Sequence, residues 1–173
     1  MQRNIKPVAI ALTVLSALGR LLPHPPNLTP VGASSLFAGS RLNGWMAYLL
    51  PILVMAVTDP LLGGYSRATP FVYASFLISV WIGRRIRVTE NPIRIGAACI
   101  LCSTQFFLLT NFSVWLLSTM YPMTLAGLSA CYIAAIPFFG LTLLGDLVFT
   151  AAIFGLYAAA TRTIAKSEVI ASA

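Results

Sequence analysis

The sequence predicts an all-α fold: a polytopic integral membrane bundle of helices in one domain, residues 1–173. Hydrophobic residues make up 58% of the chain and charged residues only 9%, with a mean hydropathy of +0.88. A soluble domain carries about 25% charged residues. A soluble fold of this size would also have to bury nearly the whole chain, which surface-to-volume scaling does not allow.

The apolar stretches predict six transmembrane helices, since a span needs about 20 residues. Region 111–140 is expected to form an outer loop together with an extra, partly embedded helix. Pro137 interrupts the apolar run 123–139, so this run is not counted as a full span. Pro7 opens the first span, where a helix tolerates proline, and Asn43-Gly44 forms a turn pair. The predicted spans are 7–22, 31–42, 45–62, 70–86, 92–110 and 141–163.

The net charge of +7 is explained by membrane topology. Eight of the eleven basic residues lie before the first span, in one short loop and after the last span, where the positive-inside rule places cytoplasmic ends. Both termini are therefore expected in the cytoplasm. No soluble basic face remains to hold phosphates, which argues against nucleic-acid binding. The eight residues are Arg3, Lys6, Arg84, Arg85, Arg87, Arg94, Arg162 and Lys166.

The segment 23–30 cannot be helical, because it holds four prolines in eight positions. It also carries the only histidine of the chain. The predicted topology places it on the outer side, together with 59–69 and 111–140. A rigid polar segment beside apolar spans indicates a solute-binding site. The candidate solute-binding residues are His24, Asn27, Thr29, Asp59, Arg67, Asn111, Trp115 and Asp146.

Several of these candidates also have structural explanations. His24 could cap a proline-rich turn, Asp59 could be an exposed helix end, and Trp115 could stack on a planar ligand or belong to an interfacial aromatic belt. A carboxylate at mid-membrane costs about 2.5–3.5 kcal/mol, so Asp146 should face protein or water. It could contact the solute or pair with an arginine across the bundle, either Arg20 or Arg67.

No catalytic or metal-binding constellation is visible, and no cofactor is expected. The chain lacks nucleophile–base motifs of known type, which predicts that it is not an enzyme. Cys99 and Cys102 lie within an apolar helix, and Cys131 stands in another segment. Free cysteine behaves as a small buried hydrophobe, so packing is the expected role of all three.

Small residues recur every four positions in the first span, at Ala9, Thr13 and Ala17. Such a stripe lets another helix approach closely. That helix could belong to the bundle or to a separate membrane subunit. The chain has no Walker motif, so ATP-driven work would require a transmembrane coupling subunit and ATPases as partners.

Residues 20–33, Arg-Leu-Leu-Pro-His-Pro-Pro-Asn-Leu-Thr-Pro-Val-Gly-Ala, resemble the signature of an uncharacterised bacterial membrane family that is labelled as transport proteins. Its core is Pro-x-Asn-x-Thr-Pro-Val-Gly-Ala. Asn111-Phe112, 131–139 and Gly145-Asp146-Leu147 look like further landmarks of that family. The resemblance implies a multi-pass protein of the bacterial cytoplasmic (inner) membrane.

More distantly, the layout is similar to the S components of energy-coupling factor vitamin transporters. Their outer loops after helices one, three and five close over a vitamin, and an alanine stripe on helix one meets the coupling subunit. The resemblance implies uptake of a small solute such as a vitamin or cofactor precursor. Thr13 departs from the alanine stripe. The alternative function is a non-transporting membrane scaffold or assembly subunit.

Overall fold

The computed structural model describes residues 5–25 and 27–171, and all regular structure within them is helical. The all-α prediction is confirmed. Arg3 and Pro26, which contributed to the sequence predictions, lie outside the described residues. The elements are α1 (Ile5–Leu18), η1 (Gly19–Leu21), α2 (Val31–Arg41), α3 (Met46–Thr58), η2 (Asp59–Leu62), α4 (Thr69–Arg85), α5 (Pro92–Leu117) and α6 (Leu125–Ala171).

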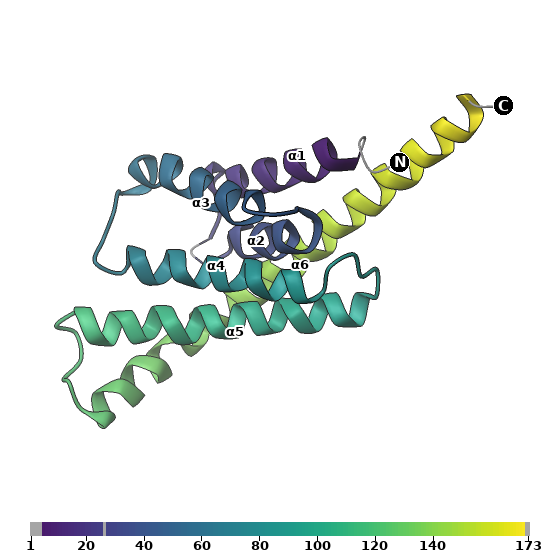
Figure 1. The fold of residues 1–173 in the computed structure, drawn as a ribbon. Helices are drawn as coiled ribbons and strands as arrows, with labels where there is room; N and C mark the ends of the chain where they lie inside the picture. The colour runs from purple at the N-terminus through teal and green to yellow at the C-terminus, as the bar shows by residue number, and fades with distance from the viewer. Residues whose placement is uncertain (1–4, 26, 172–173) are drawn as a thin grey trace.

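The short helix α2 forms the centre of the bundle. It packs against α1, α3, α4, α5 and α6, and nine of its eleven residues are buried. Figure 1 shows it between α1 and α3 on one side and α4 and α5 on the other. Phe37 on α2 makes edge-on ring contacts with Phe154 and Tyr157 of α6, at centroid distances of 5.2 and 5.4 Å. Glycine, alanine and serine make up seven of its eleven residues, and such small side chains let neighbouring helices approach closely.

Two glycines allow the backbones of α2 and α4 to touch. A Cβ atom on Gly39 would collide with the carbonyl of Val80, and one on Gly83 would collide with the carbonyl of Leu36. The obstructing atoms belong to the backbone and cannot rotate away. The close crossing of α2 and α4 therefore requires glycine, which has no side chain, at both positions.

The small-residue stripe on α1 is used within the chain. Ala9, Thr13 and Ala17 are at most 1% exposed, and Ala9 belongs to the same core cluster as Ala33 and Phe37 of α2. The Thr13 hydroxyl donates to the Ala9 carbonyl at 2.8 Å. The predicted docking of this stripe onto a separate subunit is thus corrected to packing inside the bundle.

The last two helices are longer than predicted. Residues 111–117 complete α5, residues 118–124 form the link, and α6 continues through Pro137 without a separate, partly embedded helix. Contacts with α5 hold the first part of α6: the Tyr132 hydroxyl donates to the Leu108 carbonyl at 2.7 Å, and the tilted rings of Phe107 and Phe139 lie with their centroids 4.9 Å apart. The prediction of an outer loop across 111–140 was wrong because these tertiary contacts outweigh the proline.

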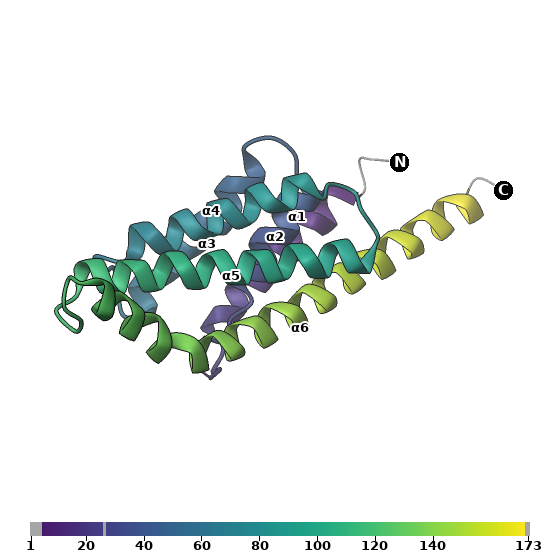
Figure 2. The same ribbon diagram turned by 90° about the horizontal axis from the view of Figure 1, so that it is seen from below.

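Two helices, α5 and α6, are long and apolar enough to cross a membrane. The 47 residues of α6 span about 70 Å, more than the hydrocarbon core of about 30 Å. The eleven residues of α2 span only about 17 Å, so six full-length spans are not supported. Figures 1 and 2 both show the start of α1 and the end of α6 at the same end of the bundle.

Candidate functional site

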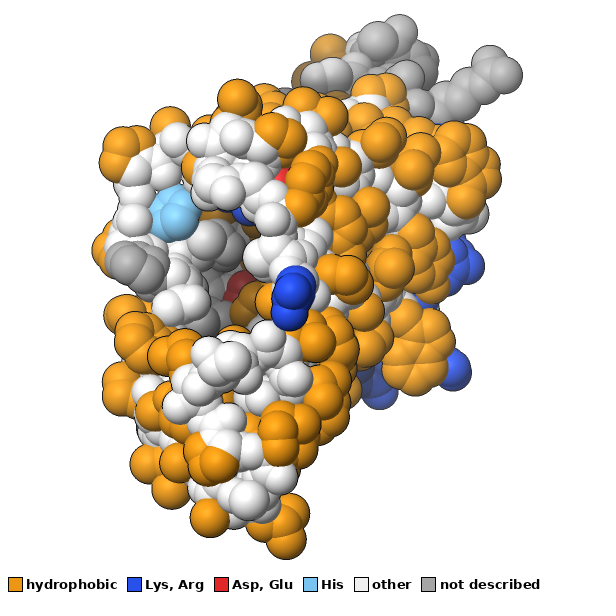
Figure 3. Space-filling view, turned by 90° about the vertical axis from the view of Figure 1, so that its left-hand side faces the viewer, with side chains coloured by type: hydrophobic (Ala, Val, Ile, Leu, Met, Phe, Trp, Pro, Cys, Tyr) orange, Lys and Arg blue, Asp and Glu red, His pale blue; other side chains and the backbone are white. Residues whose placement is uncertain are grey.

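The proline-rich segment lies at the end of the bundle opposite the termini. Figure 3 looks onto this end, whose surface is hollowed; the chain's single histidine (pale blue) lies at the edge of the hollow and an acidic side chain (red) within it. His24 is exposed, and its ring nitrogens lie 3.1 Å from the Arg20 carbonyl and 3.0 Å from the Pro25 carbonyl. Both contacts are local, so the histidine holds the turn together.

An ion pair fastens three elements at this end. Arg20 of η1 lies 2.7 Å from Asp59 of η2, and its guanidinium also donates to Thr58 at 3.2 Å. The hydroxyl of Tyr73, on α4, donates to the other Asp59 oxygen at 2.6 Å. Asp59 is only 8% exposed. The interpretation of Asp59 as an exposed helix end is therefore incorrect, and its oxygens are occupied by protein partners.

Replacing Arg20 with glutamine is expected to lower the free energy of unfolding by about 1–3 kcal/mol, because the Asp59 carboxylate would keep its charge and lose its charged hydrogen-bond donor. Arg67, exposed at the same end, makes no hydrogen bond or ion pair with the described residues. Arg67→Gln is the matched control and should change stability by less than about 0.5 kcal/mol. Thermal unfolding of the purified protein measures both. Equal effects of the two substitutions would contradict a stabilising role for the ion pair.

The carboxylate of Asp146 meets the N-terminus of α2. Its Oδ2 accepts from the Ser103 hydroxyl at 2.7 Å, and it also accepts from the backbone N–H of Ala33 in the first turn of α2. The side chain is 5% exposed. A helix N-terminus favours negative charge and leaves free N–H groups. Asp146 therefore caps α2, and the expected pairing with Arg20 or Arg67 is wrong because Arg20 binds Asp59 instead.

The proline-rich motif and the Gly-Asp pair of α6 fit each other. A Cβ atom on Gly32 would collide with the Asp146 carboxylate, and one on Gly145 would approach Leu28 Cγ to 3.2 Å. Pro30 occupies the N-cap position of α2, where the missing N–H is not needed. The segment thus turns into the bundle beside the middle of α6, instead of lying over its outer end as a loop.

Two predicted site residues, Asn27 and Asn111, meet in a cavity of about 340 Å³ between the proline-rich segment, α4, α5 and α6. Four phenylalanines contribute to its wall, and two threonines add hydroxyl groups. No charged residue lines it. Its polar and aromatic lining consists of Asn27, Thr110, Asn111, Thr142, Phe106, Phe107, Phe138 and Phe139.

The side chains of the two asparagines differ in their hydrogen bonds to the protein. Asn27 has a left-handed φ of +65° and is exposed, and its side chain makes no hydrogen bond with the described residues. The Asn111 amide donates to the Phe107 carbonyl at 2.8 Å, which leaves its oxygen for a ligand. Such a pocket, apolar with a few placed polar groups, is the usual form of a small-molecule site.

The remaining predicted site residues do not line this cavity. The indole of Trp115 donates to the Pro122 carbonyl at 3.0 Å and so fastens the link between α5 and α6. Thr29 is half-buried just before α2, and Arg67 is exposed in the turn before α4. Asp59 and Asp146 have the structural partners described above.

The phenylalanines of the cavity were not among the predicted site residues. Phe106-Phe107 and Phe138-Phe139 are doublets in two different helices, and each doublet supplies two wall residues. Repeated aromatic doublets were the signal that could have indicated an aromatic pocket. They did not stand out because phenylalanine is common in apolar helices.

The three cysteines serve packing, as predicted. Cys99, Cys102 and Cys131 are free and buried, and the Thr150 hydroxyl lies 3.4 Å from the Cys99 sulfur. Within residues 5–25 and 27–171, no group of three or more histidine, cysteine, aspartate or glutamate side chains could hold a metal ion.

These features define an all-helical protein with two helices that could cross a membrane and a small aromatic cavity at one end. The chain belongs to the family described as "Family of unknown function (DUF6580)", whose model matches residues 2–168. No curated protein and no solved structure matches the chain.

Proposed function

We propose that the protein is an integral membrane protein that binds a small neutral solute in the cavity of Asn27 and Asn111 and serves its uptake. The cavity is the observation that carries the proposal: it has the size and lining of a ligand pocket. It also lies in the region where the resemblance to S components would place a vitamin. We expect the protein to have no enzymatic activity.

The shared end of the termini (Figures 1 and 2) supports an even number of crossings, and α5 and α6 are each long and apolar enough to cross a membrane. In this proposal, helices α1, α3, α4, α5 and α6 cross the bilayer, and the second of six crossings combines the non-helical residues before α2 (22–25 and 27–30) with the half-length α2. Non-helical backbone is tolerated at membrane depth where protein covers it. Broken helices of this kind are common at transporter binding sites. Both termini then lie in the cytoplasm of a bacterial cell, as the basic residues favour.

The lining indicates the chemistry of the solute. Four phenylalanines favour a planar, largely apolar body, and the two amides and two hydroxyls suit a ligand with a few hydrogen-bonding groups. A charged ligand would be desolvated there without a partner, which is costly. Uncharged vitamins or cofactor precursors are the solute class that best fits these properties.

Inward release would need a transmembrane coupling subunit with ATPases, or rocking of the whole protein. The stripe of Ala9, Thr13 and Ala17 is already covered by the bundle. A coupling subunit would therefore have to use the exposed face of α1, which carries Leu15 at 65% exposure.

A scaffold or assembly subunit is the second candidate function. The fit of Leu28 and Gly32 against Gly145 and Asp146 favours it, because these contacts explain the proline-rich motif by folding alone. They do not explain the cavity, so solute binding remains the proposal.

The test is a thermal-shift screen of neutral vitamins and cofactor precursors on the purified protein. Asn27→Gly should weaken binding of a hit about tenfold, since about 1.4 kcal/mol of hydrogen bonding is lost, while glycine retains the left-handed backbone. Thr110→Val should weaken it similarly. No stabilisation by any compound of the screen would refute solute binding.

Thr104→Val is the matched control for Thr110→Val. Both hydroxyls donate to the carbonyl four residues earlier on α5, at 2.8 and 2.7 Å, and only Thr110 lines the cavity. The Thr104 variant should bind as the unmodified protein does. Equal loss of affinity in both variants would place the ligand elsewhere.

A further inference from the structure

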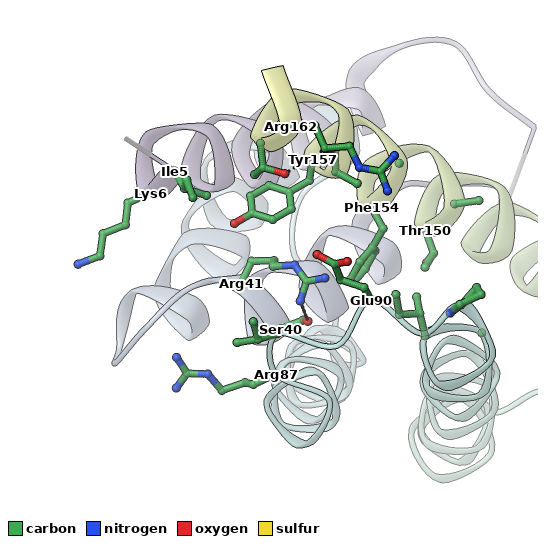
Figure 4. A pocket seen from close by; sticks show the side chains of 18 of the residues that line it. Ile5, Lys6, Ser40, Arg41, Arg87, Glu90, Thr150, Phe154, Tyr157 and Arg162 are labelled. Atoms are coloured by element: carbon green, nitrogen blue, oxygen red, sulfur yellow. Dashed lines mark hydrogen bonds between the residues drawn. The ribbon is translucent and has the colours of Figure 1, made fainter. Parts of the chain in front are cut away.

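A second and larger cavity lies at the opposite, basic end of the bundle. Its volume is about 720 Å³, and residues of α1, α2, the link between α4 and α5, α5 and α6 line it. Figure 4 shows Lys6, Arg41, Arg87 and Arg162 around it, with Glu90 as the acidic residue of the group. Three of these four cations, Lys6, Arg87 and Arg162, were interpreted from the sequence only as evidence of membrane topology.

Arg41 is held at the wall of this cavity. Its guanidinium donates to the Ser40 hydroxyl at 2.8 Å and to the Thr89 carbonyl at 2.7 Å. It also lies over the rings of Phe154 and Tyr157, 5.0 and 5.4 Å from their centroids. The buried Nε atom has no hydrogen-bond partner within the described residues. Arg41 therefore provides a fixed positive charge at the wall of the cavity, which suits an anionic ligand.

The cavity is elongated, with basic residues toward one end and apolar residues toward the other. Its α6 wall runs from Leu147 to Arg162, which corresponds to about 22 Å at 1.5 Å per residue. Arg162 lies at the C-terminal end of this wall, whereas Leu147, Ala151 and Phe154 make the wall toward Leu147 largely apolar. Small residues leave room for a chain: a Cβ atom on Gly96 or Gly155 would meet nothing within 4 Å. A compact anion would use only one end of such a groove.

We infer that this groove binds one anionic phospholipid, with its phosphate among Lys6, Arg41 and Arg162 and an acyl chain along α6. Basic pockets between membrane helices on the cytoplasmic side hold anionic lipid headgroups. The inference rests on the proposed membrane placement and is independent of the solute cavity at the other end.

The test measures how lipids shift the melting temperature of the detergent-solubilised protein. Dioleoyl phosphatidylglycerol should stabilise the protein at much lower concentration than dioleoyl phosphatidylcholine. Glycerol 3-phosphate, which carries the headgroup charge without acyl chains, should have no comparable effect. Equal stabilisation by the two lipids would overturn the inference, and so would stabilisation by glycerol 3-phosphate alone, which would indicate a soluble anion.

Charge variants locate the headgroup. The double variant Lys6→Gln/Arg162→Gln should raise the half-maximal concentration of phosphatidylglycerol about 25-fold, at about fivefold per cation. Both side chains are exposed, so folding should be unaffected. The control Arg67→Gln/Arg94→Gln removes two exposed cations that do not line the groove. Equal effects of the two double variants would contradict the assigned site.

Filling variants locate the acyl chain. In Gly155→Leu the added side chain would fill part of the groove. Gly140→Leu is the control, because Gly140 lies on the same helix and has as much open space around it but lines neither cavity. Only Gly155→Leu should weaken stabilisation by phosphatidylglycerol. Binding of a solute hit should remain unchanged in both, which separates this inference from the proposed function. Unchanged lipid stabilisation in Gly155→Leu would overturn it.

Discussion

Replacing Gly39 or Gly83 with alanine is expected to lower the free energy of unfolding by about 3 kcal/mol, the upper range for overpacking a core. The added methyl group would strike the carbonyl of Val80 or of Leu36, and relief requires α2 and α4 to move apart. For a chain of this size the melting temperature should fall by about 6–12 °C. Unfolding can be followed by a thiol-reactive dye, because the three native cysteines are buried.

Gly140→Ala provides the control for these two substitutions. A Cβ atom at Gly140 meets open space, and alanine is the better helix former by about 0.8–1.0 kcal/mol. This variant should be as stable as the unmodified protein or more so. If Gly39→Ala and Gly83→Ala behave like Gly140→Ala, the close contact of α2 and α4 is disproved.

The second large effect is expected for Asp146→Ala, with a loss of about 3 kcal/mol in stability. The substitution removes the cap of α2, worth about 1 kcal/mol, and leaves a buried N–H of Ala33 without its acceptor, at a further 1–3 kcal/mol. Asp146→Asn retains one oxygen acceptor, and its amide can donate to the Ser103 hydroxyl. That variant should lose only about 1 kcal/mol.

Solute binding distinguishes the two roles considered for Asp146. Because its carboxylate caps α2 and does not line the cavity of Asn27 and Asn111, Asp146→Asn should bind a solute hit with unchanged affinity. The Kd can be measured by isothermal titration calorimetry below the melting temperature of the variant. A tenfold or larger rise in Kd would show that Asp146 contacts the ligand after all.

Most of the helical architecture could be predicted from local sequence signals. Residues 31–42 and 70–86 were expected as helices, and α2 (Val31–Arg41) and α4 (Thr69–Arg85) lie there. Asn91 followed by Pro92 is a strong start signal, and the Asn91 side chain accepts from the N–H groups of Ile93 and Arg94. Such boundaries depend on residues within one turn of each other.

The errors concern interactions between distant residues. Pro137 suggested an interruption, yet the contacts of Tyr132 and Phe139 with α5 keep α6 continuous. The partner of Arg20 proved to be Asp59 instead of Asp146, because the end of α3, not the middle of α6, lies beside η1. Neither pairing has a local signature in the sequence.

The site was predictable in part. Asn27 and Asn111 were chosen as polar residues of segments expected on the outer side, and both line the same cavity. The phenylalanine doublets and the basic groove escaped notice, because each becomes a site only when helices far apart in the sequence come together.

Labelling of Asn27→Cys in intact bacterial cells with a membrane-impermeant maleimide tests the central proposal most directly. The native cysteines are at most 3% exposed and should stay unreactive until the protein unfolds. Position 27 should react from outside and be protected by a solute hit, while Arg94→Cys should react only after the membrane is permeabilised. Reaction at position 94 but not at position 27 in intact cells would contradict an outward-facing solute cavity.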